Sequence, residues 1–194
     1  MTREATIRRT TKETDIAVRL VLDGQGEATV KTGIGFLDHL LTALACHARF
    51  DLELTAKGDL EIDDHHTAED CALALGQALD RGLGERRGLA RFGYAYAPLD
   101  EALARAVVDL AARPVAVVDL GLKRERLGEL SAEMIPHVLQ SLAAAGRLTL
   151  HVDVLRGFND HHRAEAAFKA LALALRQAVA ETGETSAPST KGTL

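Results

Sequence analysis

The chain has 194 residues, 47% of them hydrophobic, so it is long enough to bury a substantial core in one large domain or two small ones. Its net charge of -5 and isoelectric point near 5.9 argue against a nucleic-acid partner, because there is no basic excess to neutralise a phosphate backbone. No apolar run reaches the ~18 to 20 residues of a membrane span, and the N-terminus lacks the core of a signal peptide, so we expect a cytoplasmic protein with a small-molecule ligand.

Alternating apolar and polar residues predict four strands in the first half of the chain, at residues 5–10, 16–22, 28–31 and 51–56. A helix is predicted from about residue 36 to residue 48, with His39 near its start and His47 at its end. A second helix follows Asp64-His65-His66. Its apolar residues recur at helical spacing at Ala68, Ala72, Leu75 and Leu79.

The second half repeats this order, which indicates an internal duplication. Strands are predicted at residues 94–97, 104–110, 115–120 and 147–155, with 115–120 as the counterpart of the strand that begins at Ile16. One helix carries His137, and another begins at a second double histidine, with Ala164, Phe168, Leu171 and Leu175 on its apolar face. We expect one α+β domain of two similar halves, residues 1–88 and 89–184, each a sheet covered by helices, with a C-terminal tail at 185–194.

The sequence Asp-His-His-x-Ala-Glu occurs twice, at residues 64–69 and 160–165. Within a helix, His65 and Glu69 are separated by four residues, so imidazole and carboxylate converge on one side, and the same holds for His161 and Glu165. Single His/Glu pairs are usually solvated helix faces. A repeated double histidine with glutamate instead favours a metal site, since these are common ligands of Mn, Fe and Zn.

The two histidines of each pair are adjacent and therefore point about 100° apart on a helix with ~3.6 residues per turn. One ion is then difficult for both rings to bind together. Two ions, or one ion shared between chains, are the expected arrangements. The single histidines upstream of each pair, His39 and His137, are repeated along with the motif.

Several cationic or hydroxyl side chains are candidate substrate contacts. Lys169 lies four residues after Glu165, where the first half has Leu73, and is either a cation beside the metal site or an ordinary surface partner of Glu165. The tail residues Ser189, Thr190 and Lys191 suit a phosphate group, although a flexible terminus is the alternative. Arg91 and Arg113, at the margins of predicted strands, are similar candidates. Cys46 and Cys71 are predicted to be buried free thiols.

These motifs resemble those of the imidazoleglycerol-phosphate dehydratase family of histidine biosynthesis. The matching segments are Asp38-His39, residues 64–70, residues 159–165 and Pro188-Ser189-Thr190-Lys191-Gly192, and the likeness runs from Arg9 to the C-terminus. The resemblance implies two halves related to the second domain of ribosomal protein S5. It also implies a homo-oligomer forming a hollow shell of twenty-four subunits, with active sites at subunit interfaces and two Mn2+ ions per site whose ligands come from neighbouring subunits.

The resemblance also implies roles for individual residues. The implied metal ligands are His39, His65, His66, Glu69, His137, His161, His162 and Glu165. The implied contacts to the phosphorylated imidazole substrate are His47, Arg91, Arg113, Lys169, Ser189 and Lys191. Glu13 matches the residue proposed for proton transfer, and His39, His66, Glu69, His162 and Glu165 match positions in the catalytic centre. Ala43 stands where many members have Gln, and residues 123–128 match no family feature.

The implied reaction dehydrates D-erythro-imidazoleglycerol phosphate to imidazoleacetol phosphate and water. It removes a carbon-bound proton of very low acidity, beyond the reach of an ordinary side-chain base. Lewis-acid metal ions and a carboxylate such as Glu13 would meet this need. Two alternatives use the same ligand types: a metal-dependent hydrolase, which would release phosphate or split its substrate, and a protein whose metals only join subunits.

Overall fold

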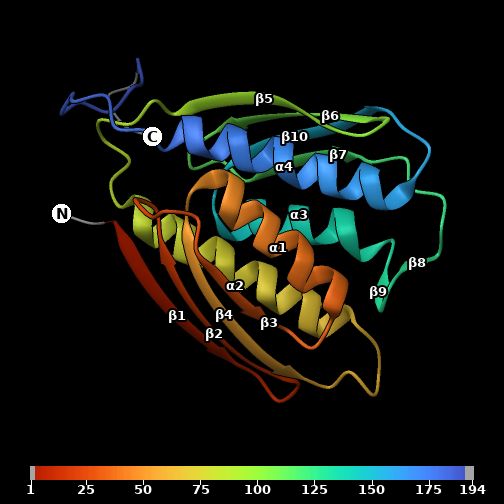
Figure 1. Ribbon diagram of the computed structural model, residues 1–194. Coiled ribbons are helices and arrows are strands. Elements are labelled where there is room, and N and C mark those ends of the chain that lie inside the picture. Colours follow the sequence, from red (N-terminus) through yellow and green to blue (C-terminus); the bar gives the residue numbers. More distant parts are fainter. Residues whose placement is uncertain (1–2, 191–194) are drawn as a thin grey trace.

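The computed structural model describes residues 3–190 and contains two four-stranded sheets, a small hairpin and four helices (Figure 1). The first half contains β1 (Glu4–Thr10), β2 (Thr14–Val21), β3 (Ala28–Lys31), α1 (Gly35–Ala48), β4 (Asp51–Gly58) and α2 (His65–Leu83). The second half contains β5 (Phe92–Leu99), β6 (Ala102–Asp109), β7 (Val115–Asp119), β8 (Arg126–Leu127), β9 (Leu130–Ser131), α3 (Met134–Ala145), β10 (Thr149–Arg156) and α4 (Asp160–Ala178). The predicted α+β class is confirmed.

The two large sheets share one topology, β1-β2-β4-β3 and β5-β6-β10-β7. In each sheet two antiparallel pairs are followed by one parallel pair, β3 with β4 and β7 with β10. The counterpart of β7 is therefore β3, and the prediction that residues 115–120 correspond to the strand at Ile16 is wrong. Alternation identifies a strand, but it does not say which neighbour the strand pairs with.

The helices lie between the two sheets, with α1 packed on α4 and α2 packed on α3 (Figure 1). The predicted apolar faces of α2 and α4 are all buried, from Ala68 to Leu79 and from Ala164 to Leu175. Glycines permit the closest approaches: a Cβ at Gly76 of α2 would lie 2.6 Å from the Leu142 carbonyl oxygen of α3, so no larger residue fits there. Helices from opposite halves thus meet along their lengths.

The outer face of the second sheet carries several exposed apolar side chains, beside His151 and the ion pair of Arg105 and Asp153 at 2.7 Å. Tyr94, Val107 and Val117 are exposed there, and Phe92 and Val115 lie in a neighbouring row of the same face. The outer face of the first sheet carries charged and polar side chains instead, such as the ion pair of Arg19 and Glu53, with 3.0 Å between Nη1 and Oε1. The duplicated halves therefore differ in what they present to their surroundings.

The cysteines and a short hairpin differ from what the sequence predicts. Cys71 is buried, and burial raises the pKa of its thiol, but Cys46 is exposed, because it lies on the side of α1 that faces away from the core. The β8–β9 hairpin was not predicted, since two-residue strands are too short to show alternation. No helix in residues 3–190 combines the length and apolar character needed to cross a bilayer.

Candidate metal centre

Each double histidine lies at the start of a helix, as the motif predicts. Asn159 caps α4, and its side-chain oxygen accepts a hydrogen bond from the backbone N–H of His161 at 3.0 Å. Before α2, Asp63 accepts from the backbone N–H of His65 at 2.9 Å. These bonds to backbone N–H groups place the paired histidines in the first turns of α2 and α4.

One cluster of possible ligands contains His65, Glu69 and His137. Nε2 of His137 lies 3.1 Å from Oε1 of Glu69, and Nε2 of His65 lies 3.8 Å from Oε2 of the same carboxylate. One ligand atom from each residue lies within 4.8 Å of the others, which is close enough for all three to bind one ion.

The second cluster contains His39, His161 and Glu165. Nε2 of His39 and Nε2 of His161 lie 2.8 Å and 3.2 Å from the same oxygen of Glu165, Oε2. Lys169 contacts the other oxygen at 2.7 Å. Burial lowers the pKa of His47, and the nearby ammonium of Lys169 lowers it further. Burial alone would raise the pKa of Glu165, but hydrogen bonds from Lys169 and His39 lower it to about 2. Glu165 is therefore a carboxylate at neutral pH.

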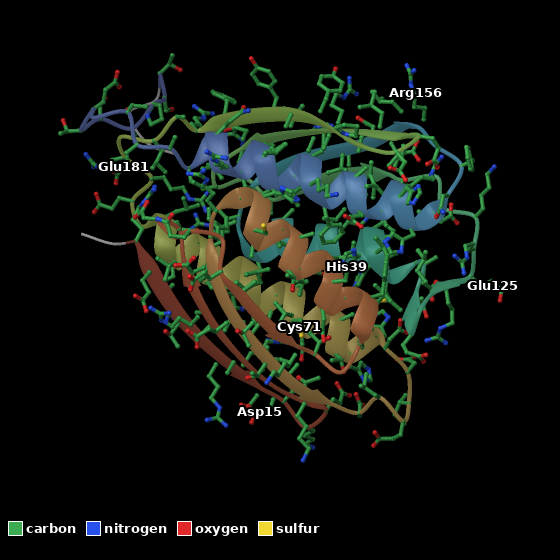
Figure 2. All side chains as sticks on the ribbon, viewed as in Figure 1. Asp15, His39, Cys71, Glu125, Arg156 and Glu181 are labelled. Carbon is green, nitrogen blue, oxygen red and sulfur yellow. The ribbon has the colours of Figure 1, made fainter. Side chains whose placement is uncertain are left out.

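In each cluster, the single histidine comes from the opposite half of the chain. His137 of α3, in the second half, meets Glu69 of α2, and His39 of α1, in the first half, meets Glu165 of α4. Figure 2 places His39 on α1, where this helix runs beside α4. The sequence left the grouping of ligands open, because it depends on how helices from different halves pack.

His66 and His162 point away from these clusters. Neither belongs to a cluster: Nδ1 of His66 lies 3.0 Å from Asp59 and Nδ1 of His162 lies 2.7 Å from Glu101, while the ring centroids of each adjacent pair are 6.1 Å apart. The expected divergence of adjacent histidines is thus observed. Hydrogen bonds with Asp59 and Glu101 raise the pKa values of His66 and His162, respectively. Sequence reasoning missed both carboxylates, since neither belongs to a recognisable motif.

Glu13 lies in the turn between β1 and β2, where one of its carboxylate oxygens is 3.9 Å from Nδ1 of His66. The side chain is 53% exposed and lines a hollow of about 320 Å³ together with Asp59 and Lys57. A group that is remote from the motif in sequence thus lies beside one of its histidines, in a position open to a small molecule.

The remaining predicted contacts gather at the start of β5. The Arg91 guanidinium donates to Asp109 at 2.7 Å and to the carbonyl oxygen of Pro188 at 2.7 Å, which brings the tail to this arginine. Arg113 lies 3.9 Å from the same aspartate. Ser189 directly follows Pro188, whereas Lys191 lies outside the described residues. Within residues 3–190, the described contacts do not join this group to either histidine cluster.

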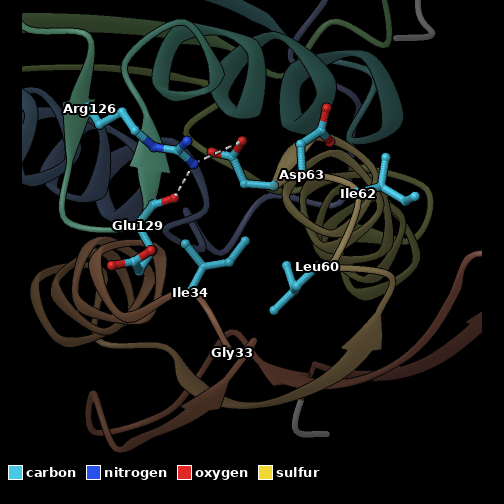
Figure 3. A pocket seen from close by; sticks show the side chains of 8 residues that line it. Gly33, Ile34, Leu60, Ile62, Asp63, Arg126 and Glu129 are labelled. Atoms are coloured by element: carbon cyan, nitrogen blue, oxygen red, sulfur yellow. Dashed lines mark hydrogen bonds and ion pairs between the residues drawn. The ribbon is translucent and has the colours of Figure 1, made fainter.

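The hairpin region that matched no family feature connects the starts of α2 and α4. Asp160 accepts from the backbone N–H groups of Lys123 and Arg124 at 2.7 Å, and Asp64 accepts from the Ser131 hydroxyl at 2.9 Å. A cavity of about 310 Å³ beside Asp64 holds none of the predicted ligands (Figure 3). Its lining residues are Gly33, Ile34, Leu60, Ile62, Asp63, Asp64, Arg126 and Glu129.

Known proteins resemble this chain over most of its length. The family model described as imidazoleglycerol-phosphate dehydratase matches residues 32–175. A protein of that name from Phytophthora nicotianae is 63% identical over 192 residues, covering 99% of this chain and 42% of the relative. Another from Candida glabrata is 56% identical over 209 residues, covering 98% of this chain and 99% of the relative.

Solved structures agree with the sequence comparison. The dehydratase from Pyrococcus furiosus, crystallised in complex with (S)-C348, has a TM-score of 0.84 at 40% identity and covers 97% of this chain and 100% of its own. The Staphylococcus aureus dehydratase has a TM-score of 0.83 at 35% identity, with 92% and 99% covered. The chain therefore belongs to the imidazoleglycerol-phosphate dehydratase family.

Proposed function

We propose that this protein catalyses the metal-dependent dehydration of D-erythro-imidazoleglycerol phosphate to imidazoleacetol phosphate and water, a step of L-histidine biosynthesis. The single observation that carries the proposal is that a chain of this family holds two His/Glu clusters, each with two imidazoles and one carboxylate. We also propose that the chain forms a single domain with halves at residues 1–88 and 89–184. We propose that the protein acts in the cytoplasm.

The donor atoms suit two Mn2+ ions. His65, Glu69 and His137 would hold one ion, and His39, His161 and Glu165 the other, since imidazole nitrogen and carboxylate oxygen are ligands that Mn2+ accepts. His66 and His162 belong to neither cluster of their own chain and contact Asp59 and Glu101 instead, so we propose that they complete clusters of neighbouring chains. When bound, the ions would supply Lewis acidity and a template for the substrate imidazole.

The other side chains divide into a proton-transfer group and substrate contacts. Glu13 is exposed beside His66, so it can accept and return a proton. Lys169 and His47 lie beside Glu165 and would contact the substrate there. Arg91 and Arg113, with Ser189 and Lys191 of the tail, would bind the phosphate through charge-assisted hydrogen bonds.

The assay that tests this function uses the purified protein, stripped of metal and reloaded with MnCl2, with imidazoleglycerol phosphate as substrate. We expect imidazoleacetol phosphate to form without release of inorganic phosphate, activity to vanish in EDTA, and metal analysis to give two Mn2+ per chain. Release of inorganic phosphate would favour the hydrolase alternative. Metal binding without turnover would favour ions that only join subunits, and zero or one ion per chain would contradict the two-ion centre.

We also propose that the chain assembles into a homo-oligomer, a shell of twenty-four subunits with active sites at the interfaces. The exposed apolar side chains on the outer face of the second sheet support an interface, because a monomer rarely exposes several large aromatic and aliphatic side chains on one face. Tyr94, at 68% exposure, lies on the edge strand β5 of this sheet, directly opposite Val107 of β6.

Replacing Tyr94 with glutamate is expected to yield a smaller particle, because a charge would have to be buried in the interface. Sedimentation velocity measures the change. The matched control is Thr6→Glu on the polar outer face of the first sheet, which should sediment like the wild type. An unchanged particle for Tyr94→Glu would place the interface elsewhere.

A further inference from the structure

The two histidines that point away from the clusters share one feature, a carboxylate on the same ring nitrogen. Nδ1 of His66 lies 3.0 Å from Oδ2 of Asp59, and Nδ1 of His162 lies 2.7 Å from Oε2 of Glu101. A carboxylate only accepts hydrogen bonds, so each contact places the imidazole proton on Nδ1. The Nε2 atom of a neutral ring is then left with its lone pair available to a metal ion.

The backbone holds the Glu101 carboxylate in place, and the Asp59 carboxylate is largely buried. Oε1 of Glu101 accepts hydrogen bonds from the backbone N–H groups of Phe158 at 3.1 Å and Asn159 at 2.8 Å, in the loop that leads into α4. Its other oxygen, Oε2, contacts His162, so both carboxylate oxygens of Glu101 have partners. The Asp59 side chain is 19% exposed, and its Oδ1 is buried without a hydrogen-bond partner in the described structure.

The two contacts come from different places in the duplicated fold. Asp59 directly follows β4, whereas Glu101 lies in the turn between β5 and β6. The turn of the first half that corresponds to the Glu101 turn carries Glu13, which is 3.9 Å from His66 and too distant for a hydrogen bond. Duplication of a half would have copied one arrangement into both. The same ring nitrogen has instead acquired a carboxylate from a different element in each half.

We propose that Asp59 and Glu101 are positioning residues that hold the Nδ1 protons of His66 and His162, so that both rings present Nε2 to Mn2+. This inference rests on the metal centre of the proposed function. It also gives the two turn carboxylates different roles. Glu101 is committed to a histidine and two backbone amides, whereas Glu13, exposed and without such contacts among the described residues, remains available for proton transfer.

The informative variant is Glu101→Gln. Its amide oxygen can still accept from the backbone N–H groups of Phe158 and Asn159, while its NH2 group would donate to Nδ1 of His162. That donation moves the imidazole proton to Nε2 and blocks the atom that should bind the metal. Asp59→Asn makes the corresponding change at His66. Glu61→Gln is the matched control, because Glu61 is exposed and lines the same hollow as Asp59.

Metal-free protein is titrated with MnCl2, and free Mn2+ is measured by its EPR signal. Thermal unfolding of each metal-free protein is recorded as a control for folding. We expect Glu101→Gln and Asp59→Asn each to weaken Mn2+ binding about 10-fold to 100-fold, the effect typical of a lost carboxylate partner of a ligating histidine. Unfolding temperatures should stay near that of the wild type, and Glu61→Gln should bind Mn2+ normally.

The inference is wrong if Glu101→Gln and Asp59→Asn both fold and both bind Mn2+ with an affinity within about twofold of that of the wild type. If one variant does not fold, the other decides, because the two contacts lie in different halves. A wild-type protein that binds no Mn2+ at all would instead contradict the metal centre of the proposed function. The two failures are therefore distinguishable.

Discussion

Glu13→Gln is expected to lower kcat by about 100-fold to 10,000-fold, the range typical of a lost general acid or base. Glutamine has nearly the shape of glutamate but cannot accept and return a proton. Because Glu13 would act on the reacting proton, kcat and kcat/KM should fall together, while Mn2+ content stays at the wild-type value. Steady-state kinetics and metal analysis on the same preparation measure both quantities.

Glu61→Gln is again the appropriate control, since it removes a carboxylate from the same hollow without approaching His66. Its kinetics should match those of the wild type. A Glu13→Gln enzyme with normal kcat and only a raised KM would assign Glu13 to substrate binding.

Glu165→Gln is expected to abolish tight Mn2+ binding at one of the two clusters, reducing bound metal from two ions per chain to one. Among residues 3–190, Glu165 is the only carboxylate of its cluster, and both His39 and His161 contact its Oε2 atom. The substitution would also leave the Lys169 ammonium without its partner, which adds repulsion toward a cation. We expect Mn2+ affinity there to fall more than about 100-fold, beyond the effect of losing a carboxylate that only supports a ligand.

Lys169→Met separates these causes, because it removes the ammonium and retains the carboxylate. Metal content should then remain at two ions per chain, with the loss confined to catalysis. Inductively coupled plasma analysis after gel filtration gives the stoichiometry. Two tightly bound ions in Glu165→Gln would show that the cluster does not depend on this carboxylate.

The sequence was informative wherever the evidence was local. The helices that begin at His65 and near His161, and the buried faces of α2 and α4, follow from residue spacing within one element. The joining of His39 to Glu165 does not follow in this way, because it depends on the packing of α1 against α4. The same limit explains the wrong counterpart for residues 115–120, since strand pairing is a relation between distant segments.

The role of the carboxylate in the turn between β5 and β6 could not be predicted from the sequence, for a related reason. Glu101 is an ordinary acidic residue in a turn, and it gains meaning only because the loop that begins α4 folds back onto it. Asp59 is likewise one of several aspartates between β4 and α2. Residue type and spacing can suggest the ligands of a metal, but the groups that orient them are visible only in three dimensions.

The exchange of His39 and His137 between the halves makes each half dependent on the other for the third side chain of its cluster. If the connection between α2 and β5 were cut, every cluster would become a contact between two separate polypeptides, and its formation would vary with protein concentration. In the continuous chain the connection supplies the missing histidine at an effective concentration that dilution does not change. The peptide link thus keeps the three side chains of each cluster together in a cell that contains few copies of the protein.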